Sequence, residues 1–136
     1  MKRTIATALL ASTLLAAAPS HAGRDAPIMN VTDTPGSWLP GVERSEDKVA
    51  RAIITACARL GWVCSISAPG EIAGRLNLRS HQADVRIPYS SEAYSILYVS
   101  SENLRYDAAE NTIHRNYNNW VLNLQRQINA ELAATT

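Results

Sequence analysis

Apolar residues follow a helical period in the first part of the predicted domain. Between Ser45 and Gly61 they recur three or four positions apart, at Val49, Ile53, Ala56, Cys57 and Leu60. The Ser45 hydroxyl can accept a hydrogen bond from a free N–H group of the first turn, and Gly61 suits the left-handed backbone at a helix end. Glu46 and Asp47 lie where the helix dipole favours negative charge. The pattern predicts a helix over residues 46–60.

From residue 62 onward the period changes to two, which is typical of strands with one covered face. The inward rows are Trp62, Cys64 and Ile66, then Ile72, Gly74, Leu76 and Leu78, then Val85, Ile87 and Tyr89, and last Tyr94, Ile96 and Tyr98. The intervening turns are Pro69-Gly70, Ser80-His81-Gln82 and Ser90-Ser91-Glu92. Short turns between consecutive strands favour antiparallel hairpins. The sequence therefore predicts a four-stranded antiparallel meander.

The register of two hairpins can also be predicted. Pairing Arg79 with Asp84 places Leu78 opposite Val85, so apolar side chains share one face and opposite charges meet on the other. The same pairing places Leu76 opposite Ile87. The following hairpin is predicted to place Tyr89 opposite Tyr94, Ile87 opposite Ile96 and Val85 opposite Tyr98.

A second helical stripe predicts a final helix that starts near Asn111-Thr112. Its apolar members are Ile113, Tyr117, Trp120, Val121, Leu124, Ile128 and Leu132. The expected fold is α+β, in the order α-β-β-β-β-α, with two helices on one face of the sheet. The other face is expected to carry charged residues and to remain open to solvent.

The first 22 residues have the three parts of a secretory signal peptide. Lys2-Arg3 precedes an apolar run over residues 5–18, and Ser20 and Ala22 form a small-x-small cleavage site. The run is too short to span a bilayer as a helix, and the cleavage point has no cysteine for lipid attachment. We expect cleavage after Ala22 and a periplasmic or secreted protein without a transmembrane anchor. Residues 23–44, rich in Pro and Gly, are predicted to be an extended N-terminal arm, and residues 45–134 a single α+β domain.

Charge and cysteine content narrow the function classes. Removal of Lys2 and Arg3 leaves 11 basic and 12 acidic residues, so the formal net charge is 11 − 12 = −1. A nearly neutral chain has no global field to attract nucleic acid or an anionic membrane. In an oxidising compartment the pair Cys57 and Cys64 is predicted to form a disulfide, since no further Cys or His completes a zinc site. No metal and no cofactor are expected.

Residues 61–124 contain a series of short motifs. They are Gly61-Trp62, Pro69-Gly70-x-Ile72, His81 with Val85-x-Ile87-x-Tyr89, Tyr94-Ser-Ile96-x-Tyr98 with Ser101, Leu104-x-Tyr106, and Ile113-His114-x-x-Tyr117-Asn118-x-Trp120-x-x-x-Leu124. In these motifs, across about half of the sequence, the chain resembles a family of small, uncharacterised exported bacterial proteins, many of them lipoproteins. The resemblance implies an envelope location and an α+β domain, and it implies no particular activity. This chain lacks the lipid-acceptor cysteine of many such proteins.

Three arginines are the first candidates for ligand binding. Arg75, Arg79 and Arg86 fall on the face expected to be open, and guanidinium groups suit carboxylates and phosphates. The alternative is that Asp84 and Glu71 neutralise them on an ordinary charged surface.

The histidines and one tyrosine complete the list of candidates. His81 and His114, with a nearby acid, can form a metal or acid–base site, or each can bond to local backbone in a turn and a helix start. Most Tyr and Trp residues fall on core-facing rows, which favours packing over a stacking platform. Tyr106 and Trp38 lie off those rows and are candidate surface contacts.

No motif for a serine nucleophile or a phosphate-binding loop occurs, so no catalytic residue is predicted. The leading hypothesis is a non-catalytic module that binds an envelope component or a protein partner through the arginine-bearing face or an edge strand. The alternatives are a secreted inhibitor that inserts the arm with Trp38 into a target, a metal-binding or enzymatic protein centred on the two histidines, and a purely structural envelope protein.

Overall fold

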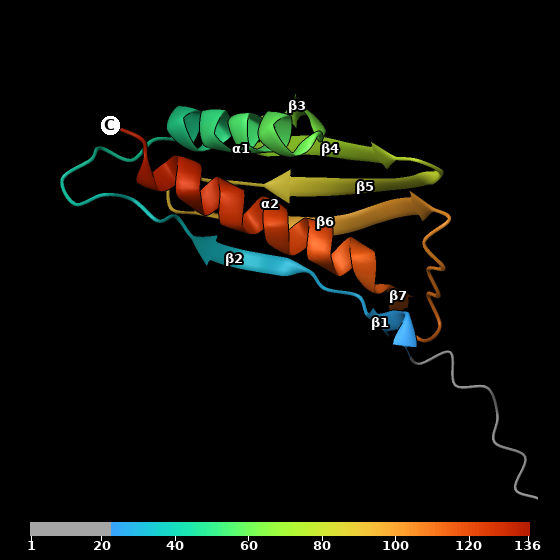
Figure 1. Ribbon diagram of the computed structural model, residues 1–136. Helices are drawn as coiled ribbons and strands as arrows, with labels where there is room; N and C mark the ends of the chain where they lie inside the picture. The colour runs from blue at the N-terminus through green and yellow to red at the C-terminus, as the bar shows by residue number, and fades with distance from the viewer. Residues whose placement is uncertain (1–22) are drawn as a thin grey trace, which may run out of the picture.

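Two helices and a mostly antiparallel sheet form the described part of the chain, residues 23–136 of this computed structural model, which confirms the α+β class. The elements in order are β1 (Asp25–Pro27), β2 (Val31–Pro35), α1 (Glu46–Leu60), β3 (Val63–Ala68), β4 (Glu71–Leu78), β5 (His81–Pro88), β6 (Ala93–Glu102), β7 (Thr112–His114) and α2 (Arg115–Ala133). The predicted signal peptide lies outside the described residues. Figure 1 shows both helices lying over the same face of the sheet.

The main sheet has five strands in the order β2-β6-β5-β4-β3, so the prediction of four strands is wrong. Strands β3 to β6 form the expected meander, and β2 adds a fifth strand beside β6. A separate pair joins β1 to β7. Strands β1 and β2 come from the segment 23–44, which we expected to be an arm. Short strands that contain proline carry a weak local signal, and their partners lie far away in the sequence.

Helix α1 has the predicted bounds, and helix α2 starts later than predicted. The Ser45 hydroxyl accepts a hydrogen bond from the Lys48 N–H, and Gly61 ends α1 with φ at 81°. Residues 112–114 form β7 instead of a first helical turn, and His114 caps α2. Pairing with β1 holds these residues extended. Within residues 23–136, no helix has the length and apolar character required to cross a membrane.

The register of the β4–β5 hairpin differs from the prediction by four residues. Arg75, not Arg79, lies opposite Asp84, and Leu78 lies opposite His81. The loop is the two-residue turn Arg79-Ser80, with Arg79 at φ 58°. A shift of four keeps every side chain on its face, so the alternation of apolar residues does not distinguish the two registers. In the next hairpin, Val85 pairs with Tyr98 and Tyr89 with Tyr94, as predicted.

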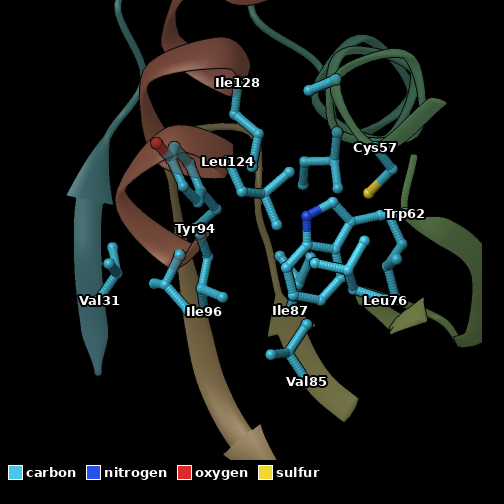
Figure 2. Close-up of a cluster of buried hydrophobic side chains, with 14 of the residues drawn as sticks. Val31, Cys57, Trp62, Leu76, Val85, Ile87, Tyr94, Ile96, Leu124 and Ile128 are labelled. Atoms are coloured by element: carbon cyan, nitrogen blue, oxygen red, sulfur yellow. The ribbon is translucent and has the colours of Figure 1, made fainter. Parts of the chain in front are cut away.

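The core lies between the helices and the covered face of the sheet. Figure 2 shows Ile87 and Ile96 of the sheet meeting Leu124 and Ile128 of α2, with the Trp62 ring packed among them. The large fully buried side chains include Tyr94, Tyr117, Ile53, Ile72, Ile87, Ile96, Leu104, Ile113, Leu124, Ile128 and Leu132. The tyrosines of the predicted inward rows thus contribute to packing.

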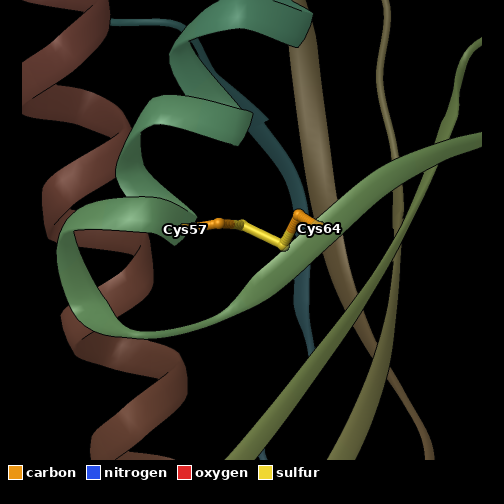
Figure 3. The surroundings of a disulfide bond; sticks show 2 residues. All are labelled: Cys57 and Cys64. Atoms are coloured by element: carbon orange, nitrogen blue, oxygen red, sulfur yellow. A yellow bond between two sulfur atoms is a disulfide. The ribbon is translucent and has the colours of Figure 1, made fainter.

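A disulfide joins the two layers at one side of the domain. Cys57 of α1 bonds to Cys64 of β3, with Cα atoms 6.1 Å apart, which confirms the predicted bridge (Figure 3). The bridge fixes the end of α1 over the edge strand β3. A disulfide of this kind is compatible with an extracellular location.

Candidate ligand-binding surface

The sheet face opposite the helices is open, and we call it the outer face. It contains a depression of about 660 Å³, which we call the outer-face hollow. The hollow extends over β3, β4, β5 and β6. Its lining residues are Val63, Ser65, Ser67, Glu71, Ala73, Gly74, Arg75, Asp84, Val85, Arg86, Val99 and Ser100.

The hollow has an apolar floor. Val63 on β3 is 73% exposed and Val99 on β6 is 55% exposed, although both are large hydrophobic residues. In the sheet register Arg75 and Asp84 lie between these two residues, and Ala73 lines the hollow two positions along β4. Exposed apolar side chains that gather in one concavity are more informative than scattered ones, because water leaves such a surface when a ligand covers it. The floor can therefore contribute hydrophobic contact to a bound molecule.

A hydrogen-bonded network surrounds Asp84 at the centre of the sheet. Arg75 donates through Nε and a terminal nitrogen to the two carboxylate oxygens of Asp84, at 2.6 and 3.3 Å. The side chains of Ser100 and Gln82 donate to the same carboxylate at 2.9 and 3.2 Å. The hydrogen bond from Arg75 is the main reason why the pKa of Asp84 is lowered. Asp84 therefore stays ionised, its negative charge is balanced by Arg75, and the two hydrogen bonds hold the Arg75 guanidinium group in place.

Arg86 has a looser ion pair. One terminal nitrogen donates to a Glu71 carboxylate oxygen at 3.3 Å, and the Arg86 side chain remains 48% exposed. A guanidinium group has five N–H donors in a planar fork, and a carboxylate or phosphate can take two of them at once. Arg86 is the better placed of the two lining arginines to receive an anionic group from a ligand.

The structure brings together two of the three predicted arginines. Arg75 and Arg86 both line the outer-face hollow. Arg79 does not line it, because the four-residue difference in register places Arg79 in the β4–β5 turn. The predicted ion pair between Arg79 and Asp84 is therefore wrong, and Arg75 takes that place.

The two histidines occupy different local environments, and neither lines the hollow. His81 begins β5; its Nδ1 bonds to the carbonyl oxygen of Asn103 at 2.8 Å, and its ring lies 6.3 Å from that of Trp120. The Nδ1 atom of His114 accepts a hydrogen bond from the Asn116 N–H at 3.2 Å. Within residues 23–136, no group of three or more His, Cys, Asp or Glu side chains is placed to hold a metal ion.

Tyr106 is exposed and belongs to a stack of tyrosines. Its ring centre lies 4.4 Å from that of Tyr98, whose ring meets Tyr117 edge-on at 5.5 Å. Tyr106 lies outside the outer-face hollow. Trp38 packs partly buried against the core instead of standing free on the surface.

The sequence reasoning missed the apolar part of the hollow. Val63 falls on the outward row of its strand, and an apolar residue at an outward position could have indicated an exposed apolar surface. Val99 also falls on the outward row, because Tyr94, Ile96 and Tyr98 form the inward row of its strand. A bulge in β6 between Tyr98 and Ser100 adds one residue, so Ser100 lies beside Asp84 in the hollow although strict alternation places it on the covered face.

Comparison of the chain with protein-family models, with curated proteins and with solved structures gives no match.

Proposed function

We propose that this protein is a non-catalytic binding module that acts outside the cytoplasm and holds an envelope component or a protein partner on its outer face. The observation that carries the proposal is the outer-face hollow, in which Arg75 and Arg86 lie beside an apolar floor. Binding sites commonly combine apolar area with a few placed polar groups. The ligand class that fits is a molecule with a carboxylate or phosphate next to an apolar portion.

Two features support the location. The sequence has the pattern of a secretory signal peptide over residues 1–22, and Cys57 and Cys64 are joined. Disulfides persist mainly in oxidising compartments. The envelope also supplies anionic molecules and exported proteins as ligands for the two arginines.

The test compares three forms of the protein as bait. The wild type, the double variant Arg75→Ser with Arg86→Ser, and the control Arg79→Ser are immobilised and incubated with an envelope extract of the producing cells. Arg79 lies on the same hairpin but does not line the hollow. We expect the wild type and the control to retain the same ligands and the double variant to lose them. Retention of the same ligands by all three forms would refute the proposal.

Folding of the variants is checked by thermal melting. The Arg75 and Arg86 side chains are 55% and 48% exposed, and exposed ion pairs contribute about 1 kcal/mol or less to stability. The double variant is therefore expected to remain folded, so that a loss of ligand reports the surface itself.

The hypothesis of an inhibitor that inserts its arm requires a change of structure. Strand β2 is paired with β6, and Trp38 packs on the core, so insertion into a target would first break these contacts. The hypothesis of a histidine-centred site requires two side chains that already bond to backbone atoms in different places. The hollow needs no rearrangement, and for this reason we favour it.

A further inference from the structure

One edge of the main sheet has few of the features that usually protect an edge. Strand β3 has the sequence Val-Cys-Ser-Ile-Ser-Ala, with no charged residue and no proline, and its register shift lies at the end of the strand, between Ile66 and Ala68. The opposite edge strand, β2, contains Asp33 in a left-handed conformation, Pro35 and a register shift. Charges, prolines and bulges prevent an edge from pairing with another chain. Of the two edges of the main sheet, β3 is thus the one better able to accept a further strand.

Strand β3 also exposes apolar side chains on both sides of the sheet. Val63 lies in the outer-face hollow, whereas Ile66 pairs with the buried Ile72 and so points to the covered face. Ile66 is nevertheless 57% exposed. An added strand alternates its side chains between the two faces and would cover both residues. A small molecule in the hollow would cover Val63 alone.

The sheet register connects this edge to Arg86. Ser65 of β3 lies opposite Ala73 of β4, and Ala73 lies opposite Arg86 of β5. Because Ser65 and Ala73 have small side chains, no bulky group on the outer face separates the β3 edge from Arg86 in this row, and we call this row the path to Arg86. The bond from Arg86 to Glu71 brings the guanidinium group over β4, nearer to the edge. A long side chain on an added strand, placed beside Ser65, would stand on the outer face, and its end could bend along this path toward the Arg86 guanidinium group.

We propose that the ligand of the outer face is an extended peptide segment that pairs with β3 as a sixth strand and places a carboxylate side chain beside Ser65, directed to Arg86. This inference rests on the proposed function and specifies its ligand. The main-chain hydrogen bonds give affinity, and the carboxylate gives specificity. A second copy of this chain fits less well. Two paired β3 strands would offer Arg86 no carboxylate, because β3 has no acidic residue.

The test is a selection of peptides from a random twelve-residue library displayed on phage. The baits are the disulfide-bonded protein, the variant Arg86→Glu, the neutral variant Arg86→Gln and the control Arg79→Glu. The wild type and the Arg79→Glu control are expected to enrich peptides with alternating β-branched residues and one acidic position. Arg86→Glu is expected to favour Lys or Arg at that position, and Arg86→Gln to show no charge preference. Arg86→Glu introduces a carboxylate that would repel Glu71. The neutral variant Arg86→Gln is included because it removes the positive charge without this repulsion.

Hydrogen exchange then locates the bound peptide. A selected peptide is expected to slow exchange of the β3 backbone amides at least tenfold and to leave those of β2 unchanged. Its affinity for Arg86→Gln is expected to fall at least tenfold. Peptides that protect other strands, or that bind all baits equally, would overturn the inference. So would self-association of the wild type through β3, detected by sedimentation and lost in Val63→Lys.

The result also separates this inference from the proposed function. If no peptide is enriched and the envelope ligands are still lost from the Arg75→Ser, Arg86→Ser variant, the hollow binds another class of ligand. The peptide inference then fails and the proposed function stands. If the double variant retains the same envelope ligands as the wild type, and the selected peptides bind all of their baits equally, both the inference and the proposed function fail.

Discussion

Two buried tyrosines offer a test of the hydrogen bonding in the core. Tyr117 is fully buried, and within residues 23–136 its hydroxyl has no hydrogen-bond partner. A buried polar group without a partner costs about 1–3 kcal/mol. The change Tyr117→Phe removes the hydroxyl and keeps the ring. We expect it to raise the free energy of unfolding by about 1 kcal/mol, at the lower end of that range.

Tyr94 provides the matched control, because its side chain is also buried but its hydroxyl is hydrogen-bonded. Its hydroxyl donates to Asn129 Oδ1 at 2.7 Å and lies 3.3 Å from the Gln125 carbonyl oxygen. Tyr94→Phe removes this bond and leaves the Asn129 oxygen without a donor. We expect the free energy of unfolding to fall by about 1 kcal/mol. The two substitutions are chemically identical, so the opposite signs isolate the hydrogen bond.

The assay is urea unfolding followed by tryptophan fluorescence, repeated between pH 7 and pH 11. Burial raises the pKa of Tyr117 in the folded protein. Below the unfolded pKa of about 10 the hydroxyl is neutral in both states and its titration does not affect stability; as the pH rises above 10 the hydroxyl ionises more readily in the unfolded chain, so the free energy of unfolding falls. Tyr117→Phe should lose less stability than the wild type at high pH. If Tyr117→Phe is as destabilising at pH 7 as Tyr94→Phe, its hydroxyl has a partner and the reasoning is refuted.

Three further predictions concern the disulfide, a helix end and the Asp84 network. Replacement of Cys57 and Cys64 by Ala should lower the free energy of unfolding by roughly 2–3 kcal/mol, since the bridge closes a short loop, and the loss is checked by urea unfolding against the wild type. Gly61→Ala should cost about 1 kcal/mol, because φ is 81° there, and an unchanged melting temperature would contradict this reason. Asp84→Asn should lower stability at pH 7, and the difference should shrink as the pH falls below about 4. The reason is that Arg75 lowers the pKa of Asp84, so the ionised carboxylate stabilises the fold only at higher pH; a difference constant from pH 7 to pH 2 would count against the ion pair.

Local signals predicted the parts of the fold that depend on local contacts. The cap at Ser45, the apolar stripe and Gly61 define α1, and all three act within a few residues. The register of the β4–β5 hairpin was predicted wrongly, because a shift by an even number preserves the apolar face. The twist preference of a two-residue turn decides between the registers, and Arg79 adopts the left-handed φ that this turn requires.

Contacts between distant segments explain the remaining errors in the fold. Asp25 pairs with His114, so the start of α2 depends on a strand that lies early in the chain. In the same way β2 finds its partner β6 only in the folded chain. No local period reports such a pairing.

The sequence predicted the charged residues of the candidate site better than it predicted the shape of the outer-face hollow. Alternation placed Arg75 and Arg86 on the open face, as the structure has them. Alternation also assigned Arg79 to this group, but the observed strand ends at Leu78 and Arg79 lies in the turn. The bulge that brings Ser100 beside Asp84 in the hollow has no local signature. The curvature that hollows the face arises from the whole sheet.

The pairing of residues 25–35 with β6 and β7 also imposes an order on folding. Asn118 donates its side-chain amide to the Pro27 carbonyl oxygen, across 91 residues of chain. The hairpins from β3 to β6 are local and can form first, whereas β1 and β2 must wait for partners that are synthesised much later. During that interval both β6 and β3 are open edges, so the partly folded chain is more prone to aggregate than the native one. A chaperone that holds residues 25–35 would prolong this interval, and one that covers β6 would protect the chain during it.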